Sequence, residues 1–367
     1  MADKENQKMG NSALRIFIGC FAATILLLFR HGYVFGSGDQ SEMLPYAKYL
    51  ADNSLYPSDF YIQSIAASVP NERFVFSWLL SLFGDRLNWA VFGLHFSATM
   101  LLILGLYRIT SLALITEGAR WLAALAPVLL LYDVNLGGNE LYYNIFVPSY
   151  VAQVIGIWVF VYGIKGNAFK FFGLLILMTY IHPLIGLQLW LLLSLSFLIV
   201  FLKDEPQKKL GGFFIFNGLY LATAGFFILK IKNSYDGGNI SAQSFLDIIA
   251  FRVPHHYFPH TFPIKNWLLL FLPVLLGWHL SYSFLRYVFR LIFIGAIVYV
   301  IGVYIFKSPT VLSMQWFSTT VWLKTFSFIF TLNLIESYLE KTSFFAKILE
   351  PQNVLLKPIV ADRKSVV

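Results

Sequence analysis

Charged residues are scarce in this chain of 367 residues. Lys, Arg, Asp and Glu together make up 13% of it, while hydrophobic residues make up 58%. An ordinary soluble domain carries about 25% charged residues. The apolar residues also fall in runs that are too long for the core helices of a soluble domain, so we expect the surrounding solvent to be lipid. A soluble globular domain is thereby excluded.

Other absences narrow the class of protein further. The chain has one cysteine, Cys20, which excludes a disulfide framework and a cysteine-based metal site. The segment GSGDQS lacks the lysine of a phosphate-binding loop and follows no expected strand, so we find no cytosolic nucleotide-binding motif. The 27 Lys and Arg exceed the 19 Asp and Glu by a net charge of +8. In a membrane protein such an excess indicates orientation rather than a nucleic-acid partner.

The hydropathy pattern predicts an all-α polytopic bundle of about ten transmembrane helices, because a hydrocarbon core takes about 20 helical residues. The third and fifth expected spans are short. Residues 1–13 and 335–367 would form tails on either side of a transmembrane domain over residues 14–334. The expected spans are residues 14–29, 88–107, 121–131, 147–162, 171–181, 183–202, 211–229, 267–285, 291–306 and 316–334.

The distribution of Lys and Arg predicts the orientation. Both residues concentrate in the two tails and in alternate short connections, which predicts that both termini lie in the cytoplasm. The longer polar connections then face outward. They are the outer loops of residues 30–87, 132–146, 230–266 and 307–315.

The first outer loop carries the candidate catalytic carboxylates. A glycine-rich turn precedes Asp39, Gln40 and Glu42, and the apolar residues of segment 43–50 recur at near-helical spacing, which predicts an amphipathic helix in the membrane interface. Asp59 follows between aromatic residues. Carboxylates at this level can act as general bases or bind a cation. The alternative is that Asp39 and Glu42 simply begin a helix, as an N-cap does.

Two further positions are candidates for substrate binding. The second outer loop, YDVNLGGNELYYN, contains Glu140 among asparagines whose amides suit a hydroxyl-rich ligand, although a turn without a ligand explains it equally well. His182 precedes a helix-breaking proline near the outer face. An imidazole is costly in lipid unless it faces a cavity, so His182 is either a site residue or a satisfied core histidine.

The outer loop of residues 230–266 contains the segment FRVPHHYFPHTFPIKNW. It brings together Arg252, His255, His256 and His260. Arginine binds phosphate through a forked pair of hydrogen bonds, and imidazoles can donate to the same group, so we interpret this segment as an anion clamp. The alternatives are a metal site, for which no carboxylate shares the spacing, and a proline-stiffened lid.

The last expected span contains a lysine. Gln315 lies at the outer mouth of this span, and Lys324 lies about three turns inside it. Because a lysine at that depth costs several kcal/mol unless it is paired, we expect Lys324 to face the bundle interior and to contact a carboxylate or a lipid phosphate.

These features resemble a known superfamily. A first span, a large outer loop with an acidic motif, an interfacial helix and many short-looped spans are similar to the GT-C polytopic glycosyltransferases, and the strings GDQSEMLPY, LYPSDFY, IHPLIG, RVPHHYFP and MQWFSTTVWLK look like those of a bacterial family of GT-C-like membrane proteins. The resemblance covers about residues 30–334. It implies a multi-pass protein of a bacterial inner membrane, a polyprenyl-phosphate sugar as donor and Asp39 as the acidic residue, with Glu42 or Asp59 as a second acid. Where members of the superfamily usually have two adjacent acidic residues, this chain has Asp39 and Gln40.

The sequence thus predicts transfer of a sugar from a polyprenyl-phosphate lipid at the outer face, in the synthesis of envelope glycans or glycoconjugates. Asp39 would deprotonate the acceptor, and Arg252 with the histidines would stabilise the leaving phosphate. The sequence identifies no cofactor with certainty, and a divalent Mg²⁺ or Mn²⁺ ion stays an open alternative. The expected partners are lipids and no nucleic acid. Two rival functions are a transporter or flippase of lipid-linked sugars and a non-catalytic subunit of polysaccharide assembly.

Overall fold

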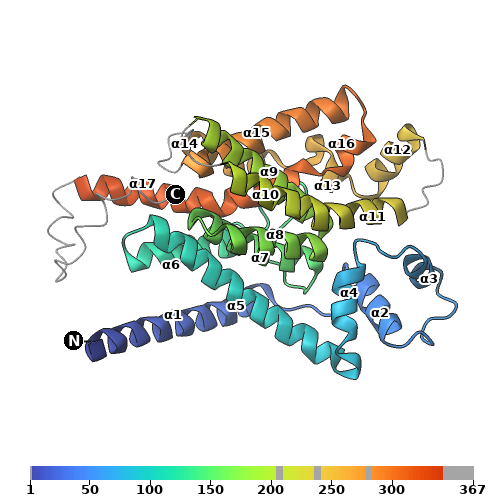
Figure 1. The fold of residues 1–367 in the computed structure, drawn as a ribbon, viewed down its shortest axis with the longest axis horizontal. Coiled ribbons are helices and arrows are strands. Elements are labelled where there is room, and N and C mark those ends of the chain that lie inside the picture. The colour runs from blue at the N-terminus through green and yellow to red at the C-terminus, as the bar shows by residue number, and fades with distance from the viewer. Residues whose placement is uncertain (1, 204–209, 235–240, 278–282, 342–367) are drawn as a thin grey trace.

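The computed structural model describes residues 2–203, 210–234, 241–277 and 283–341 (Figure 1). Throughout these residues the regular secondary structure is helical, and the described chain contains no strand. The expected all-α class is therefore confirmed. This outcome follows from long apolar runs that satisfy their backbone hydrogen bonds internally, as lipid requires.

Long helices occupy each of the ten segments that hydropathy marks as spans. Residues 278–282, within the eighth expected span, lie outside the described residues. The long helices are α1 (Ala2–His31), α5 (Leu87–Ala113), α6 (Glu117–Leu129), α7 (Pro148–Ile164), α8 (Ala168–Ile181), α9 (Pro183–Lys203), α10 (Gly211–Tyr220), which continues through the π-helical turn η2 (Leu221–Gly225) into α11 (Phe226–Ser234), α14 (Ile264–Gly277), α15 (Ser283–Tyr304) and α17 (Val321–Lys341).

Five helical stretches among the described residues are long and apolar enough to cross a membrane, and α7 and α8 are shorter apolar helices. Several helices of this chain can therefore span a bilayer, whereas the count of ten remains a prediction. The five stretches are Ser12–His31, Gly84–Ala113, Pro183–Lys203, Gly211–Ser234 and Phe284–Tyr304.

Short helices gather at one end of the bundle, on the right in Figure 1. All except η4, which lies at the start of the last expected span, come from the segments that the sequence assigns to outer loops. The first group is α2 (Gln40–Ala51), α3 (Phe60–Ala67), α4 (Phe74–Ser81) and η1 (Gly84–Arg86), and the second is α12 (Ala242–Arg252), α13 (Pro254–Tyr257), η3 (Pro259–Thr261), α16 (Pro309–Ser313) and η4 (Trp316–Thr320).

The opposite end of the bundle holds the start of α1, the turn from α5 to α6 and the end of α17 (Figure 1). Here Glu336 of α17 accepts hydrogen bonds from the backbone N–H groups of Ile115 and Thr116 at 2.9 and 3.0 Å. The Thr116 hydroxyl donates to the same carboxylate at 2.6 Å. The carboxylate thereby satisfies donors at the start of α6 and ties it to α17.

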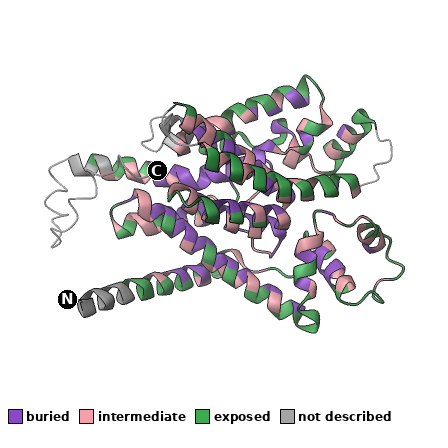
Figure 2. Ribbon diagram, in the orientation of Figure 1, coloured by how far each residue is buried: buried purple, intermediate pink, exposed green. Residues whose placement is uncertain are grey.

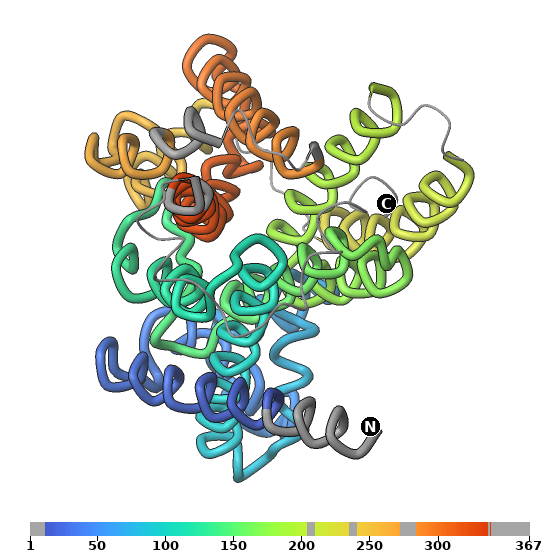
Figure 3. The backbone as a smooth tube through the Cα atoms, turned by 90° about the vertical axis from the view of Figure 1, so that its left-hand side faces the viewer, coloured from blue at the N-terminus to red at the C-terminus, as the bar shows by residue number. Residues whose placement is uncertain are grey.

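Small residues allow the central helices to approach closely. A side chain at Gly105 of α5 would collide with Ile157 of α7, and one at Gly156 of α7 would collide with Trp322 of α17. Packing of this kind is the usual source of helix association in lipid, where burial from water adds little. Figure 3 shows α1 and α5 on one side of the bundle, and α14, α15 and α17 on the other.

Outward faces of the long helices stay exposed although they are apolar. In Figure 2 the exposed residues follow the outer sides of α1, α10 and α11. Phe29 of α1 is 86% exposed and Ile215 of α10 is 72% exposed. Large apolar side chains facing outward suit contact with lipid tails and not with water.

Helix boundaries differ from the expected spans at three places. Helix α1 begins at Ala2 instead of residue 14, because the preceding segment is rich in strong helix formers. Helix α17 likewise continues to Lys341. Arg286 and Arg290, expected in a connection between spans, lie inside α15. Local hydropathy detects the apolar part of a helix only. Polar residues that continue the same helix are therefore left out of the expected span.

Candidate functional site

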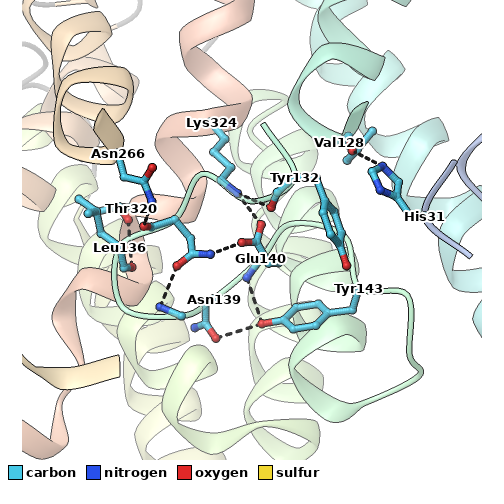
Figure 4. A network of polar contacts seen from close by, with 12 residues as sticks. His31, Val128, Tyr132, Leu136, Asn139, Glu140, Tyr143, Asn266, Thr320 and Lys324 are labelled. Carbon is cyan, nitrogen blue, oxygen red and sulfur yellow. Dashed lines mark hydrogen bonds and ion pairs between the residues drawn. The ribbon is translucent and has the colours of Figure 1, made fainter. Parts of the chain in front are cut away.

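The connection between α6 and α7, residues 130–147, crosses the middle of the site in Figure 4. Its carboxylate Glu140 lies 2.5 Å from the ammonium of Lys324, which is fully buried in α17. Lys324 also donates to the carbonyl of Tyr132 at 3.4 Å. The sequence placed both charged residues in a substrate site. In the structure they neutralise each other, which gives the buried lysine the partner it requires.

Amide groups complete the surroundings of this ion pair. The side chain of Asn135 donates to Glu140, and its backbone carbonyl accepts from Asn266 of α14 at 2.8 Å. Burial raises the pKa of Glu140, and the Lys324 cation and the Asn135 amide oppose that rise. At the other end of the connection, His31 stacks on Tyr132 with 4.2 Å between ring centroids. The segment is thus held on α1, α14 and α17.

Two glycines in this connection let a histidine approach. Gly137 and Gly138 have φ of +78° and +76°, a left-handed conformation that glycine adopts without strain. The His256 ring of α13 lies so close that a Cβ on Gly138 would overlap it. Its Nδ1 is 3.3 Å from the Gly137 carbonyl oxygen. Because a carbonyl only accepts, Nδ1 carries the proton, and Nε2 of the neutral ring is an acceptor.

The turn that carries Asp39 packs against this same connection. A Cβ on Gly38 would lie 3.4 Å from the side chain of Ile145, and Gln40 donates to the carbonyl of Phe146 at 3.0 Å. Burial chiefly lowers the pKa of His256, and the Asp39 carboxylate opposes that lowering. The connection of residues 130–147 thus carries Tyr143 and contacts both the turn of Asp39 and His256.

Asp39 does not use its side chain as a helix cap. It occupies the N-cap position of α2, but with helical backbone angles and without a side-chain capping bond. Asp39 is exposed. The expected helix over segment 43–50 is present as α2, which buries Met43, Leu44, Tyr46 and Ala47. The N-cap alternative thus leaves the carboxylate unexplained.

The other acids of the first outer loop have structural partners. Glu42 forms an ion pair with Arg73 and accepts a hydrogen bond from the Tyr61 hydroxyl at 2.7 Å, so it ties α2 to α3 and α4. Asp59 accepts from the backbone N–H of Ile62 at 2.9 Å, which is an N-cap of α3. These contacts explain both residues without a catalytic role.

Gln40 braces the turn that carries Asp39. Its side-chain oxygen accepts from the N–H of Gly36 at 2.8 Å, and its amide donates to the carbonyl of Phe146 at 3.0 Å. The residue is 1% exposed. Gln40 therefore fixes the turn against the start of α7, and acts on Asp39 by position.

The second outer segment is divided by the fold. His256 turns inward to the glycines, whereas Arg252, at the end of α12, and His255 are exposed. The rings of His255 and His256 lie 4.3 Å apart. His260 Nδ1 lies 2.5 Å from the hydroxyl of Tyr304 in α15. Arg252 and His255 therefore remain available for an anion, while His260 has a partner at the bundle edge.

Two remaining candidates lie around α9. The N–H of Ile185 donates to His182 Nδ1 at 3.4 Å, so the imidazole helps to cap the start of α9. Gln315 has φ of +43° and donates to the Tyr257 hydroxyl, and its carbonyl accepts from Gln188 of α9 at 3.1 Å. Gln315 thereby joins the α13 segment to the start of η4.

The donor set does not fit a metal ion. Among the residues that the structure describes, no group of three His, Cys, Asp or Glu side chains is placed to hold one. Glu42, which would supply the second carboxylate, is instead paired with Arg73. We therefore derive no chemical step through Mg²⁺ or Mn²⁺.

Sequence reasoning missed Tyr143 and Gly138. The Tyr143 hydroxyl accepts from the N–H of Glu140 at 3.0 Å and donates to Asn139 at 3.2 Å, within the connection that contacts the turn of Asp39. Gly138 matters because no other residue leaves room for His256. The paired glycines in YDVNLGGNELYYN were the one available signal, since consecutive glycines mark a backbone that needs positive φ.

Comparison with known proteins adds no relative. No protein-family model, no curated protein and no solved structure matches this chain.

Proposed function

We propose that this chain is a membrane glycosyltransferase that takes a sugar from a polyprenyl-phosphate lipid at the outer face, with about ten spans and both termini in the cytoplasm. The observation that carries the proposal is the placement of Asp39: an exposed carboxylate without a capping bond, on a turn that packs against the same connection as His256. A helix cap or a salt bridge would occupy the Asp39 carboxylate. A general base has to remain free.

The proposed step moves one proton and one sugar. The acceptor oxygen forms a bond to the anomeric carbon while the bond from that carbon to the phosphate oxygen breaks, and its electron pair leaves with the polyprenyl phosphate. The acceptor proton passes to Asp39. His256, which presents Nε2 as an acceptor, orients the acceptor sugar through a neighbouring hydroxyl. Arg252 and His255, both exposed beside this segment, stabilise the charge on the leaving phosphate.

The carrier alternative rests on the charged pair in the bundle. Lys324 and Glu140 are both needed to keep the connection of residues 130–147 against α17, so a substrate anion would have to break a 2.5 Å ion pair to reach the lysine. The Lys324–Glu140 ion pair therefore favours an enzyme with a fixed outer site over a carrier with a substrate pathway through the bundle.

The test is turnover by purified protein in detergent with a panel of polyprenyl-phosphate hexoses and pentoses, read as release of polyprenyl phosphate. Asp39→Asn should reduce turnover by on the order of 10²-fold or more, because the proton acceptor is lost while asparagine still suits an N-cap position. Asp59→Asn is the matched control, since Asp59 caps α3 and asparagine caps equally well. Equal turnover of Asp39→Asn and wild type would refute the role of Asp39. Absence of release by wild type from every donor would refute the function.

A further inference from the structure

A cavity of about 340 Å³ opens on the outer surface beside the site. It lies between the segment that follows α1, helix α2 and the start of α5. Its volume falls in the range of small-molecule pockets, about 300–1,000 Å³. The residues that matter for its chemistry are Phe35, Ser41, Leu44, Lys48, Tyr56 and Asn88.

Lys48 gives this cavity its charge. It is the one charged residue among those that line the cavity, it is exposed, and it forms no ion pair with any other described residue. Asn88 also lines this cavity, and its side-chain amide can supply a second donor. An unpaired ammonium beside an amide is suited to a phosphate or another anion.

A neighbouring cavity decides on which side of Lys48 an anion would bind. This second cavity, of about 420 Å³, shares Lys48 and Asn88 with the first but is also lined by Asp52 and Asp85. Two carboxylates repel an anion. The side of Lys48 that faces Phe35 is therefore the favourable one.

The position of the cavity indicates a lipid rather than a soluble anion. Asn88 lies near the start of the apolar stretch Gly84–Ala113, which can span a membrane. Around it, Phe35, Trp89 and Phe92 are 41%, 81% and 39% exposed. Exposed aromatic side chains at the end of a spanning helix mark the level of the lipid headgroups. The cavity opens at the depth where phospholipid phosphates lie.

We propose that this cavity binds the phosphate headgroup of an anionic bilayer phospholipid. Lys48 and Asn88 hold the phosphate, and the acyl chains lie along Phe35 and Trp89. The bound lipid joins α2 to the start of α5. The site is independent of the proposed transfer reaction, because it needs neither Asp39 nor a sugar donor.

The experiment is native mass spectrometry of the full-length, delipidated protein titrated with phosphatidylglycerol or phosphatidylcholine. Phosphatidylglycerol should bind more tightly than phosphatidylcholine. Lys48→Gln should weaken its binding by about fivefold or more, the contribution of one basic side chain that faces anionic lipid. Lys48→Arg should retain binding, because the charge is kept. Lys230→Gln is the matched control, since Lys230 is an exposed lysine of α11 that lies outside the cavity.

Four results would overturn the proposal. Unchanged phosphatidylglycerol binding by Lys48→Gln would remove Lys48 from the site. Equal binding of phosphatidylcholine would remove the requirement for an anion. Displacement of phosphatidylglycerol by millimolar inorganic phosphate would indicate a soluble anion, and its displacement by equimolar polyprenyl phosphate would assign the cavity to a substrate instead. None of these readouts depends on turnover, so failure here is distinguishable from failure of the proposed enzyme.

Discussion

Removal of one partner of the buried Lys324–Glu140 pair should destabilise the protein strongly. At 2.5 Å and an effective dielectric constant near 20, the attraction between the two charges is about 7 kcal/mol. Loss of hydration costs several kcal/mol for each ion, so the pair as a whole contributes little net stability. A single substitution, Lys324→Met, leaves the Glu140 carboxylate buried without its cation. We expect the free energy of unfolding to fall by about 3–5 kcal/mol.

The measurement is equilibrium unfolding in mixed micelles with increasing denaturing detergent, followed by tryptophan fluorescence. The double variant Lys324→Met/Glu140→Gln removes both charges and should recover most of the loss, so the coupling energy between the two sites should exceed about 2 kcal/mol. Lys170→Met is the control, because Lys170 is an exposed lysine of α8. A loss below about 1 kcal/mol in Lys324→Met, the size expected of an exposed pair, would refute the reasoning.

The pH dependence of Lys324→Met gives an independent check. Burial already raises the pKa of Glu140 while Lys324 opposes the rise, so removal of Lys324 should raise that pKa further. A carboxyl with a pKa above its unfolded value binds more protons in the folded state, so stability falls as pH rises through that window. The stability gap between the variant and wild type should therefore narrow toward acid pH. A difference in stability between the variant and wild type that stays constant from about pH 4, near the pKa of Glu140 in the unfolded chain, to about pH 7 would contradict this account.

Three further predictions concern the outer site and the topology. Gly138→Ala should displace His256 and reduce turnover in the polyprenyl-phosphate assay by on the order of tenfold or more, while Gly173→Ala, which meets no neighbour, should not. Arg252→Lys should raise the KM for the lipid-linked donor about tenfold, because lysine cannot form the forked phosphate contact, and an unchanged KM would remove Arg252 from the site. Cysteines introduced at Ser58 and Ser241 should react with an impermeant maleimide added to intact cells, and one at Ser365 should react only after permeabilisation; the native Cys20 is 1% exposed and adds little background.

Local sequence patterns were sufficient for the class of the protein and for its helices. Hydrophobic runs predicted every long helix, since a run that avoids water also has to satisfy its own hydrogen bonds. The alternation of apolar residues over segment 43–50 likewise predicted α2, and its burial of Met43, Leu44 and Tyr46 follows from that spacing. These features depend on residues within a few turns of one another.

Local patterns were less informative about the acids of the first outer loop. Asp39, Glu42 and Asp59 look alike in sequence, since each precedes or begins a helical run. In the structure Glu42 pairs with Arg73 and Asp59 accepts from the Ile62 N–H, whereas Asp39 makes no side-chain capping bond. Which of the three carboxylates stays unpaired depends on where the fold places Arg73 and His256. The local sequence around each carboxylate does not specify that placement.

The sequence by itself determined that this chain is helical, with several apolar helices long enough to cross a membrane and with its polar motifs in the connections. Only the tertiary structure decided that Lys324 pairs with Glu140, that Gln40 braces the turn of Asp39 against Phe146, and that His256 packs on Gly138. The physical reason is the range of the interactions. Helix formation in lipid is settled within one segment, whereas a buried charge or imidazole is satisfied by whichever distant group the packing of the helices brings within about 3 Å.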